Sequence, residues 1–159
     1  MLAPGHQKNS SLKEKKMLHH LRTKLSLLLI LIPTIVFSAD DISISNAFIK
    51  KPRPGVDVTA GFATINSNIE LKVMKVSNKN FKNIELHSMK MNYGVMEMRK
   101  LTEPKLGPNS PLVLTPGSDH LMLFGINKEL KSGEKVDLTF LFNDNKGKDI
   151  TKVFKFTIK

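Results

Sequence analysis

Two histidine–methionine pairs are the residues of this chain best suited, by type and spacing, to bind a metal ion. His87-Ser88-Met89 and His120-Leu121-Met122 each place a methionine two positions after a histidine. On a β-strand, residues i and i+2 point to the same face, so each pair would present an imidazole and a thioether side by side. This donor set suits Cu(I), whereas Mg²⁺, Ca²⁺ and Mn²⁺ prefer oxygen and zinc sites seldom use methionine.

Further methionines lie between the two pairs and flank the dipeptide Tyr93-Gly94. With the methionine of the first pair they form a cluster of four: Met89, Met91, Met96 and Met98. We expect a hairpin with an even-numbered loop centred on Tyr93-Gly94, which pairs Met89 with Met98. The same register pairs Met91 with Met96, and all four sulfurs then share one face with His87. A slip of one residue would move Met96 and Met98 to the other face.

The distribution of methionine and histidine differs from what core packing alone would produce. Methionine commonly fills irregular cores, and a single histidine on an apolar strand is usually a core group with its hydrogen bonds satisfied. Five of the six methionines after position 38 nevertheless fall between positions 89 and 122, with the only two histidines of that part of the chain. Met74 is the sixth, and we expect it in the core. If the strand of His120 ends at the mouth of the same barrel as His87, the donors converge.

The first 38 residues have the layout of an export signal. A basic stretch leads into the uncharged, largely apolar run Leu25–Phe37, and small residues follow. The run has 13 residues, whereas a membrane-spanning helix needs about 20. We therefore expect cleavage before Ala39 and a periplasmic location, with a membrane-anchored form as the less favoured alternative. Met17 would be a more usual start, so residues 1–16 can be a gene-start artefact.

Charge and cysteine content exclude several classes of function. Residues 1–38 hold six of the 25 basic and one of the 14 acidic residues, which leaves a net charge of +6 for residues 39–159. That charge is dispersed, and with one Tyr and no Trp the chain lacks a nucleic-acid footprint. Cysteine is absent, which excludes disulfides and the His₂Cys site of blue-copper electron carriers. Ser118-Asp119-His120 cannot form a relay on a strand, because neighbours face opposite ways, so we expect no enzyme.

Short alternating or β-branched segments separated by turn residues predict an all-β fold. We expect one domain over residues 39–159, an antiparallel β-sandwich or barrel whose last two strands form a hairpin. The predicted strands are 42–49, 58–65, 71–76, 84–91, 95–101, 112–114, 120–124, 136–142 and 151–158. Proline and glycine residues supply the breaks, including the segment 104–111.

The spacing resembles that of the periplasmic PCuAC-like copper chaperones, which help to load copper into cytochrome oxidase. Their pattern, H-x10-M-x21-H-x-M, is met without a gap by His87, Met98, His120 and Met122. Segments 47–49, 61–66, 85–87, 94–96 and 116–117 are also similar. The resemblance implies a cupredoxin-like fold and Cu(I) ligation by these four residues, and Met89 would be a fifth ligand if the hairpin register holds.

The resemblance also implies partners for the protein. Cytochrome oxidase subunit II, or a thiol copper chaperone, would accept the copper from a monomeric protein. Several members of that family carry a His- and Met-rich C-terminal extension associated with Cu(II). Residues 156–159 contain neither residue type, which puts a second, Cu(II), site in doubt and leaves open whether Cu(II) also binds. Two other functions stay open, namely copper storage or detoxification, and an exported β-sandwich that docks a partner protein through its methionine face without metal.

Overall fold

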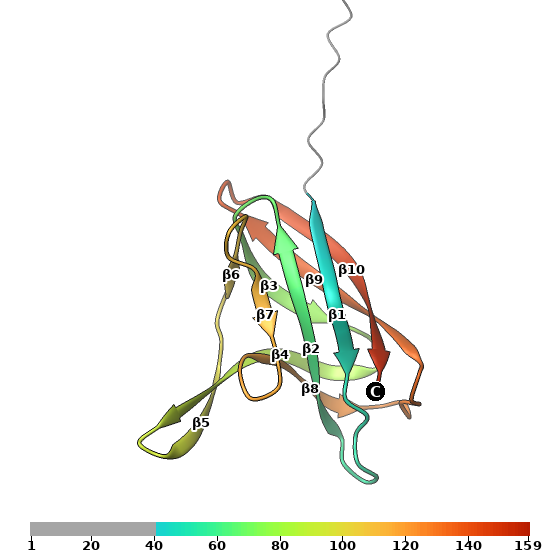
Figure 1. Ribbon diagram of the computed structural model, residues 1–159. Coiled ribbons are helices and arrows are strands. Elements are labelled where there is room, and N and C mark those ends of the chain that lie inside the picture. Colours follow the sequence, from blue (N-terminus) through green and yellow to red (C-terminus); the bar gives the residue numbers. More distant parts are fainter. Residues whose placement is uncertain (1–40) are drawn as a thin grey trace, which may run out of the picture. The chain divides into compact units, whose positions relative to one another are not determined.

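The computed structural model describes residues 41–159, which form ten β-strands (Figure 1). The expected leader, residues 1–38, lies outside the described residues. The strands are β1 (Ile42–Ile49), β2 (Val58–Ser67), β3 (Leu71–Ser77), β4 (Phe81–Asn92), β5 (Val95–Lys100), β6 (Lys105–Leu106), β7 (Leu112–Leu114), β8 (His120–Ile126), β9 (Lys135–Asp144) and β10 (Asp149–Ile158). Within residues 41–159 there is no helix with the length and hydropathy needed to span a membrane. The all-β fold is confirmed, and the two-residue strand β6, inside the expected break 104–111, was missed.

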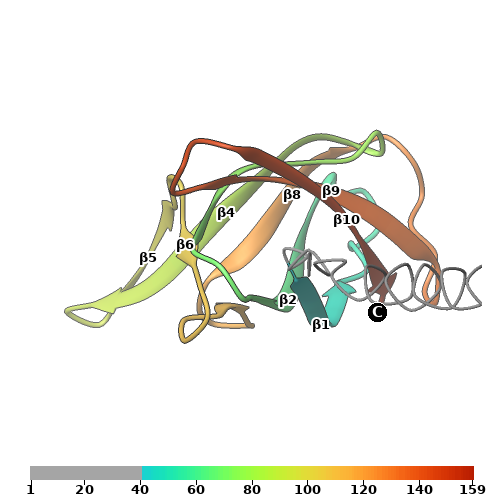
Figure 2. The same ribbon diagram turned by 90° about the horizontal axis from the view of Figure 1, so that it is seen from above.

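Hydrogen bonds join these strands into one sheet. Its order is β5-β4-β8-β2-β1-β10-β9-β3-β6, and β7 also pairs with β2. The sheet curls over (Figure 1, Figure 2). Apolar side chains from its strands pack together into one core. The strand pairs of the described residues are antiparallel except β1–β10, where Ile49 lies beside Ile158 in a parallel pair. The predicted antiparallel sandwich holds for the other pairs. β1 and β10 can run in the same direction because a long connection separates them along the chain.

The centre of the core is formed by alternating residues of β9 and β10. Phe140, Phe142 and Phe156 are fully buried. The ring centroid of Phe140 lies 5.8 Å from that of Phe142 and 6.3 Å from that of Phe156. Phe142 also pairs with Ile150 across the turn, which confirms the predicted hairpin of the last two strands. This aromatic cluster packs on β9 and β10, whereas the metal-binding candidates lie on other strands.

Met74 lies at a β-bulge of β3 and is not in the core as expected. The register of β3 against β9 shifts between Val73 and Lys75, so Met74 is the extra residue of the bulge. A bulge leaves its extra residue unpaired and redirects its side chain. Met74 is 44% exposed, while Val73 stays buried. The assignment to the core was wrong because Met74 alternates with the buried Leu71 and Val73, which puts its side chain on the outer face.

The β4–β5 hairpin has the predicted register. Met89 pairs with Met98, and Met91 pairs with Met96. The two loop residues, Tyr93 and Gly94, both have positive φ angles, 47° and 82°, as the tight turns that match the twist of a hairpin require. Both views show the hairpin extending beyond the body of the domain (Figure 1, Figure 2).

Replacement of Leu121 by alanine tests how firmly the core holds β8. Leu121 is fully buried, and it stands between His120 and Met122 in the sequence. Its truncation leaves a cavity and should lower the free energy of unfolding by about 2–5 kcal/mol. Val153→Thr, on the exposed face of β10, keeps a β-branched shape and should change it by no more than about 0.5 kcal/mol. Urea unfolding of both variants makes the comparison, and equal effects would show that β8 is not anchored by the core.

Candidate metal centre

Two neighbouring strands, β4 and β8, bring the two histidines together on one face of the sheet. β4 lies between β5 and β8. His87 on β4 is directly opposite His120 on β8, and their ring centroids are 6.2 Å apart. The sequence separates the two residues widely, and the pairing of β4 with β8 alone makes them neighbours.

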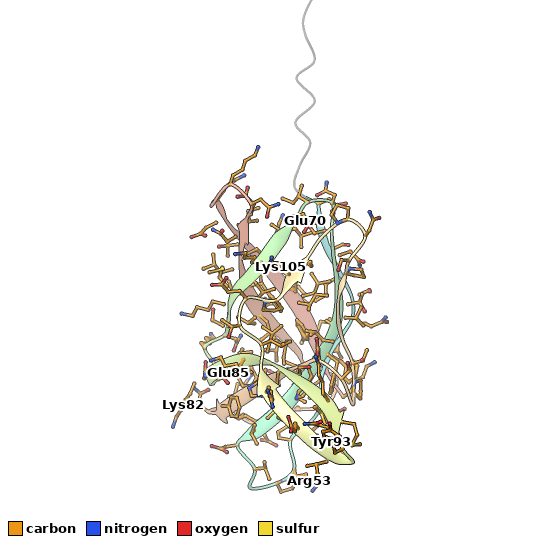
Figure 3. All side chains as sticks on the ribbon, turned by 90° about the vertical axis from the view of Figure 1, so that its left-hand side faces the viewer. Arg53, Glu70, Lys82, Glu85, Tyr93 and Lys105 are labelled. Atoms are coloured by element: carbon orange, nitrogen blue, oxygen red, sulfur yellow. The ribbon has the colours of Figure 1, made fainter. Side chains whose placement is uncertain are left out.

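This face is the outer face of the sheet. Along β4, Ile84, Leu86 and Ser88 are buried on the core side. Glu85 and His87 alternate with them and are only partly exposed on the other side. Figure 3 shows the β4–β5 hairpin, with Glu85 partway along β4 and Tyr93 at the tip. The histidines therefore meet through adjacent strands, and no barrel mouth is needed to bring them together.

The predicted methionine donors surround the histidine pair. Met122 follows His120 by two residues and is paired with Glu85, so it shares their face. On the other flank, Met98 is paired with Met89, and Lys100 is paired with His87. Met98 is thus a diagonal neighbour of His87, at a backbone separation that long side chains span. All five predicted residues lie on one face of three adjacent strands.

His120 is held in one orientation and keeps one free ring nitrogen. Its side chain is buried, and the residue is only 4% exposed. Its Nδ1 lies 2.8 Å from the carbonyl oxygen of Ser118, and because a carbonyl can only accept, Nδ1–H donates. The other ring nitrogen, Nε2, then carries a lone pair. Phe62 packs beside the imidazole, with ring centroids 6.4 Å apart.

His87 shows the same arrangement with its ring nitrogens exchanged. Its Nε2 is 2.9 Å from a carboxylate oxygen of Glu85, to which Nε2–H donates. Its Nδ1 then carries the lone pair, and this atom is buried without a hydrogen-bond partner. No other buried side-chain nitrogen or oxygen of residues 41–159 lacks a partner. A buried acceptor without a partner costs free energy, so a cation bound to the lone pair of Nδ1 would remove that cost.

Glu85 and Lys100 orient His87, and reasoning from the sequence did not assign them this role. Lys100 donates to Glu85 over 2.7 Å, and Asn83 donates over 2.9 Å. The Lys100 ammonium, followed by the His87 imidazole, lowers the pKa of Glu85 from 4.5 to about 2. Carboxylates commonly fix the tautomer of metal-binding histidines in this way. The available signal was the spacing of Glu85 and His87, two residues apart on a strand.

The donor set of this face combines imidazole and thioether. Within the part of the chain that the structure describes, no group of three or more His, Cys, Asp or Glu residues is arranged to hold a metal ion. Burial changes across the site, from nearly complete at His120 to 49% exposure at Met98. The arrangement can hold a soft cation between buried nitrogens on one side and accessible sulfurs on the other.

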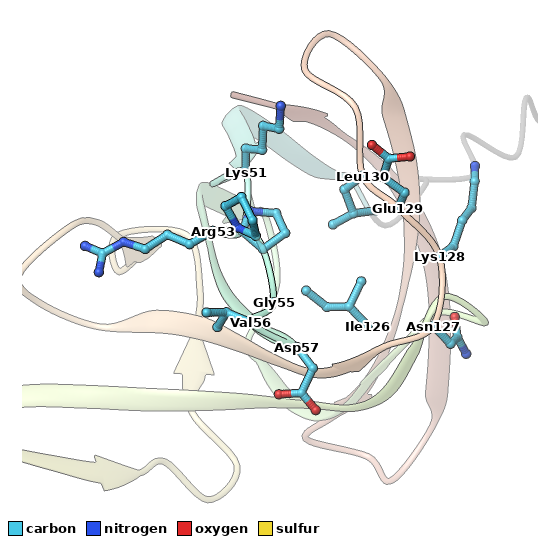
Figure 4. A pocket seen from close by; sticks show the side chains of 12 residues that line it. Lys51, Arg53, Gly55, Val56, Asp57, Ile126, Asn127, Lys128, Glu129 and Leu130 are labelled. Atoms are coloured by element: carbon cyan, nitrogen blue, oxygen red, sulfur yellow. The ribbon is translucent and has the colours of Figure 1, made fainter.

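A separate pocket of about 880 Å³ lies between the β1–β2 and β8–β9 loops (Figure 4). Residues 51–57 and 126–130 line it. Ile126 and Leu130 face the hollow, while the charged ends of Lys51 and Arg53 point away from it. No histidine or methionine contributes to its walls, so it is distinct from the candidate metal centre.

A family model described as "Putative lipoprotein LpqE-like" matches residues 42–153. The chain belongs to the LpqE-like family. This match spans β1 to β9 and the first half of β10, and it confirms the resemblance to the PCuAC-like family, while the four-residue pattern itself stays a prediction. Among curated proteins, this LpqE-like chain is 33% identical over 86 residues to the uncharacterized protein RP573 of Rickettsia prowazekii (53% of this chain and 48% of that one). It is 25% identical over 107 residues to the "Putative lipoprotein Lxx21020" of Leifsonia xyli subsp. xyli (67% and 64%). The aligned part thus spans about half to just under two thirds of these relatives.

Solved structures with the same fold include PCuAC domains. The "Copper-bound PCuAC domain from PmoF2" superposes on the LpqE-like chain with a TM-score of 0.58 at 18% identity, covering 76% of this chain and 95% of that one. Apo-DR1885 from Deinococcus radiodurans gives a TM-score of 0.54 at 18% identity, covering 100% and 95%. At these identities the likeness establishes the fold, and the predicted cupredoxin-like β-sandwich is confirmed.

Replacement of Glu85 by glutamine tests the orienting contact without metal. The carboxylate pKa is lowered on folding, so its contribution to stability is complete above about pH 4.5 and is lost as the pH falls through about 2. Glu85→Gln should lower the free energy of unfolding at neutral pH by about 1–2 kcal/mol, since water screens part of the interaction. The difference from the wild type should vanish near pH 2.

Glu103→Gln is the matched control, because its contact with Lys72 is long (3.5 Å) and exposed. It should remain close to the wild type at every pH. Denaturant unfolding of the apo protein at steps from neutral pH to about pH 2 measures both variants. If Glu85→Gln and the wild type differ by a constant amount over this range, Glu85 is not held as the structure shows.

Proposed function

We propose that this chain is an exported, non-enzymatic carrier that binds Cu(I) and passes it to an acceptor protein. The observation that carries the proposal is the buried Nδ1 of His87, which has no hydrogen-bond partner. His87 is paired with His120 on β8, and methionines lie on the same face of β5 and β8. Membership of the LpqE-like family supports the proposal. So do the titles of two structures of the same fold, a copper-bound PCuAC domain of PmoF2 and Cu(I)-DR1885 of Deinococcus radiodurans.

The proposed ligands are two nitrogens and two sulfurs, with a third sulfur close by. His87 would bind through Nδ1 and His120 through Nε2, since their other ring nitrogens already donate hydrogen bonds. Met98 and Met122 would supply the thioethers, and Met89, opposite Met98, is the additional donor. Thioethers bind without losing a proton and survive in an oxidising compartment where thiols would form disulfides.

The exposure of Met98 suits release as well as binding. An acceptor can approach from the accessible sulfur side and replace the ligands one at a time, while the buried imidazoles keep their positions. Copper then moves according to relative affinity, and no catalytic residue is required. We propose cytochrome oxidase subunit II, or a thiol copper chaperone, as the acceptor of the monomeric protein. The lipoprotein names of the family and of its Leifsonia relative support export and a periplasmic location.

Competition with a chromogenic Cu(I) chelator tests the ligand set. Met98→Leu and Met122→Leu keep the size of the side chain and remove a soft donor, so each should weaken Cu(I) binding by about tenfold or more. The double variant Met98→Leu, His120→Ala should lose more than either single variant. Met74→Leu removes an exposed methionine far along the sheet, on β3, and should leave the affinity unchanged.

The affinity measurement also separates the carrier from the partner-docking alternative. Binding by the wild type that is no tighter than binding by the double variant would exclude copper carriage and leave the methionine face as a protein-docking surface. X-ray absorption of the loaded protein should show both nitrogen and sulfur neighbours. A shell of sulfur alone would remove the histidines from the site.

Copper transfer tests the direction of delivery. The loaded protein, mixed with a soluble oxidase subunit II domain or with a thiol chaperone, should lose its copper to the acceptor. Analysis of the metal content of the separated proteins measures the transfer. Retention of copper against both acceptors, with the affinity intact, would assign the protein to storage or detoxification.

A further inference from the structure

The outer part of the β4–β5 hairpin holds a second pair of methionines, which the proposed site does not use. Met91 and Met96 are direct partners across the two strands. They lie one alternate position farther along the hairpin than Met89 and Met98, and therefore on the same face. The four methionines form two successive cross-strand rungs that lead from His87 toward the tip.

Packing does not account for methionine at these positions. Met91 is 66% exposed and Met96 is 56% exposed. Five of the nine exposed large apolar side chains among residues 41–159 belong to this one hairpin, at positions 91–98. The hairpin extends beyond the body of the domain, so no core lies beneath its tip (Figure 1, Figure 2). Core filling, the usual role of methionine, is not available there.

The polar groups of the outer hairpin lie on its opposite face. Glu97 accepts hydrogen bonds from Asn92 over 2.9 Å and from Arg99 over 2.7 Å. Residues 97 and 99 alternate with Met96 and Met98 along β5, so they point away from the sulfurs. The methionine face of the tip thus offers a soft cation two directly opposed thioethers, and these polar side chains do not compete for it.

We propose that Met91 and Met96 form a second, weaker Cu(I) site through which copper enters and leaves the inner site. This inference rests on the proposed function, because the outer pair would connect the proposed histidine–methionine site, here called the inner site, to the solvent. Cu(I) exchanges its ligands from one thioether rung to the next, without a change of oxidation state and without proton transfer. The inner site gains imidazole nitrogens that the outer pair lacks, so the outer pair is occupied only after the inner site is full.

The test follows methionine methyl groups by NMR while the apo protein is titrated with Cu(I) under anaerobic conditions. The methyl signals of Met98 and Met122 should reach their end point with the first equivalent. Those of Met91 and Met96 should move mainly after it. The signal of Met74 is the internal control, because it is an exposed methionine with no cross-strand methionine partner.

Met91→Leu with Met96→Leu is the matched variant, since leucine keeps the apolar bulk of the tip and removes the sulfurs. It should retain the first binding event, lose the second, and slow the removal of copper by a chelator. Methyl signals of Met91 and Met96 that move no more than that of Met74 would overturn the inference. Unchanged copper removal in the variant would overturn it as well, and would favour a docking role that leucine can fulfil.

The two proposals fail in distinguishable ways. Loss of the second event alone leaves the inner carrier site standing. If the signals of Met98 and Met122 do not respond to the first equivalent, the proposed function fails. In that case a response at Met91 and Met96 would show the outer pair acting alone, and the entry-and-exit role would fall with the inner site.

Discussion

The hydrogen-bond ladders that β4 shares with β8 on one side and β5 on the other determine which side chains can meet. Each ladder has one register, and that register places His87 opposite His120 and puts the methionines on the same face. Because side chains alternate along a strand, a slip of one residue on either side would move a whole set of donors to the opposite face of the sheet. The buried core side of β4 and β8 opposes a slip between those two strands, since it would expose Leu86 and Leu121.

The same register creates a gradient of access along the hairpin. The imidazoles lie on the body of the domain, where neighbouring groups fix their orientation, and the thioethers become more exposed toward the tip. A site built wholly in the core would hold a cation but release it slowly. A site built wholly on the tip would lack the oriented nitrogens. One long hairpin joined to the sheet supplies both properties.

Much of this arrangement could be predicted from the sequence, because it depends on local periodicity. The i, i+2 spacing of the histidine–methionine pairs and the turn at Tyr93-Gly94 are sufficient for the hairpin and its register. What could not be predicted depends on relations between distant strands. The parallel pairing of β1 with β10 and the bulge at Met74 leave no periodic signal in the chain. The outer placement of the site could have been predicted, since Ile84 and Leu86 mark the core face of β4 and alternate with Glu85 and His87.

The unpartnered Nδ1 of His87 also has a consequence for the lifetime of the protein. A ligand that binds only the folded chain increases its stability in proportion to the logarithm of its concentration over its dissociation constant. The empty protein carries an unsatisfied buried acceptor and lacks that contribution, so it opens more often. Under the proposed function, proteases would therefore degrade empty molecules before loaded ones, and the copper supply would set how much of the protein accumulates.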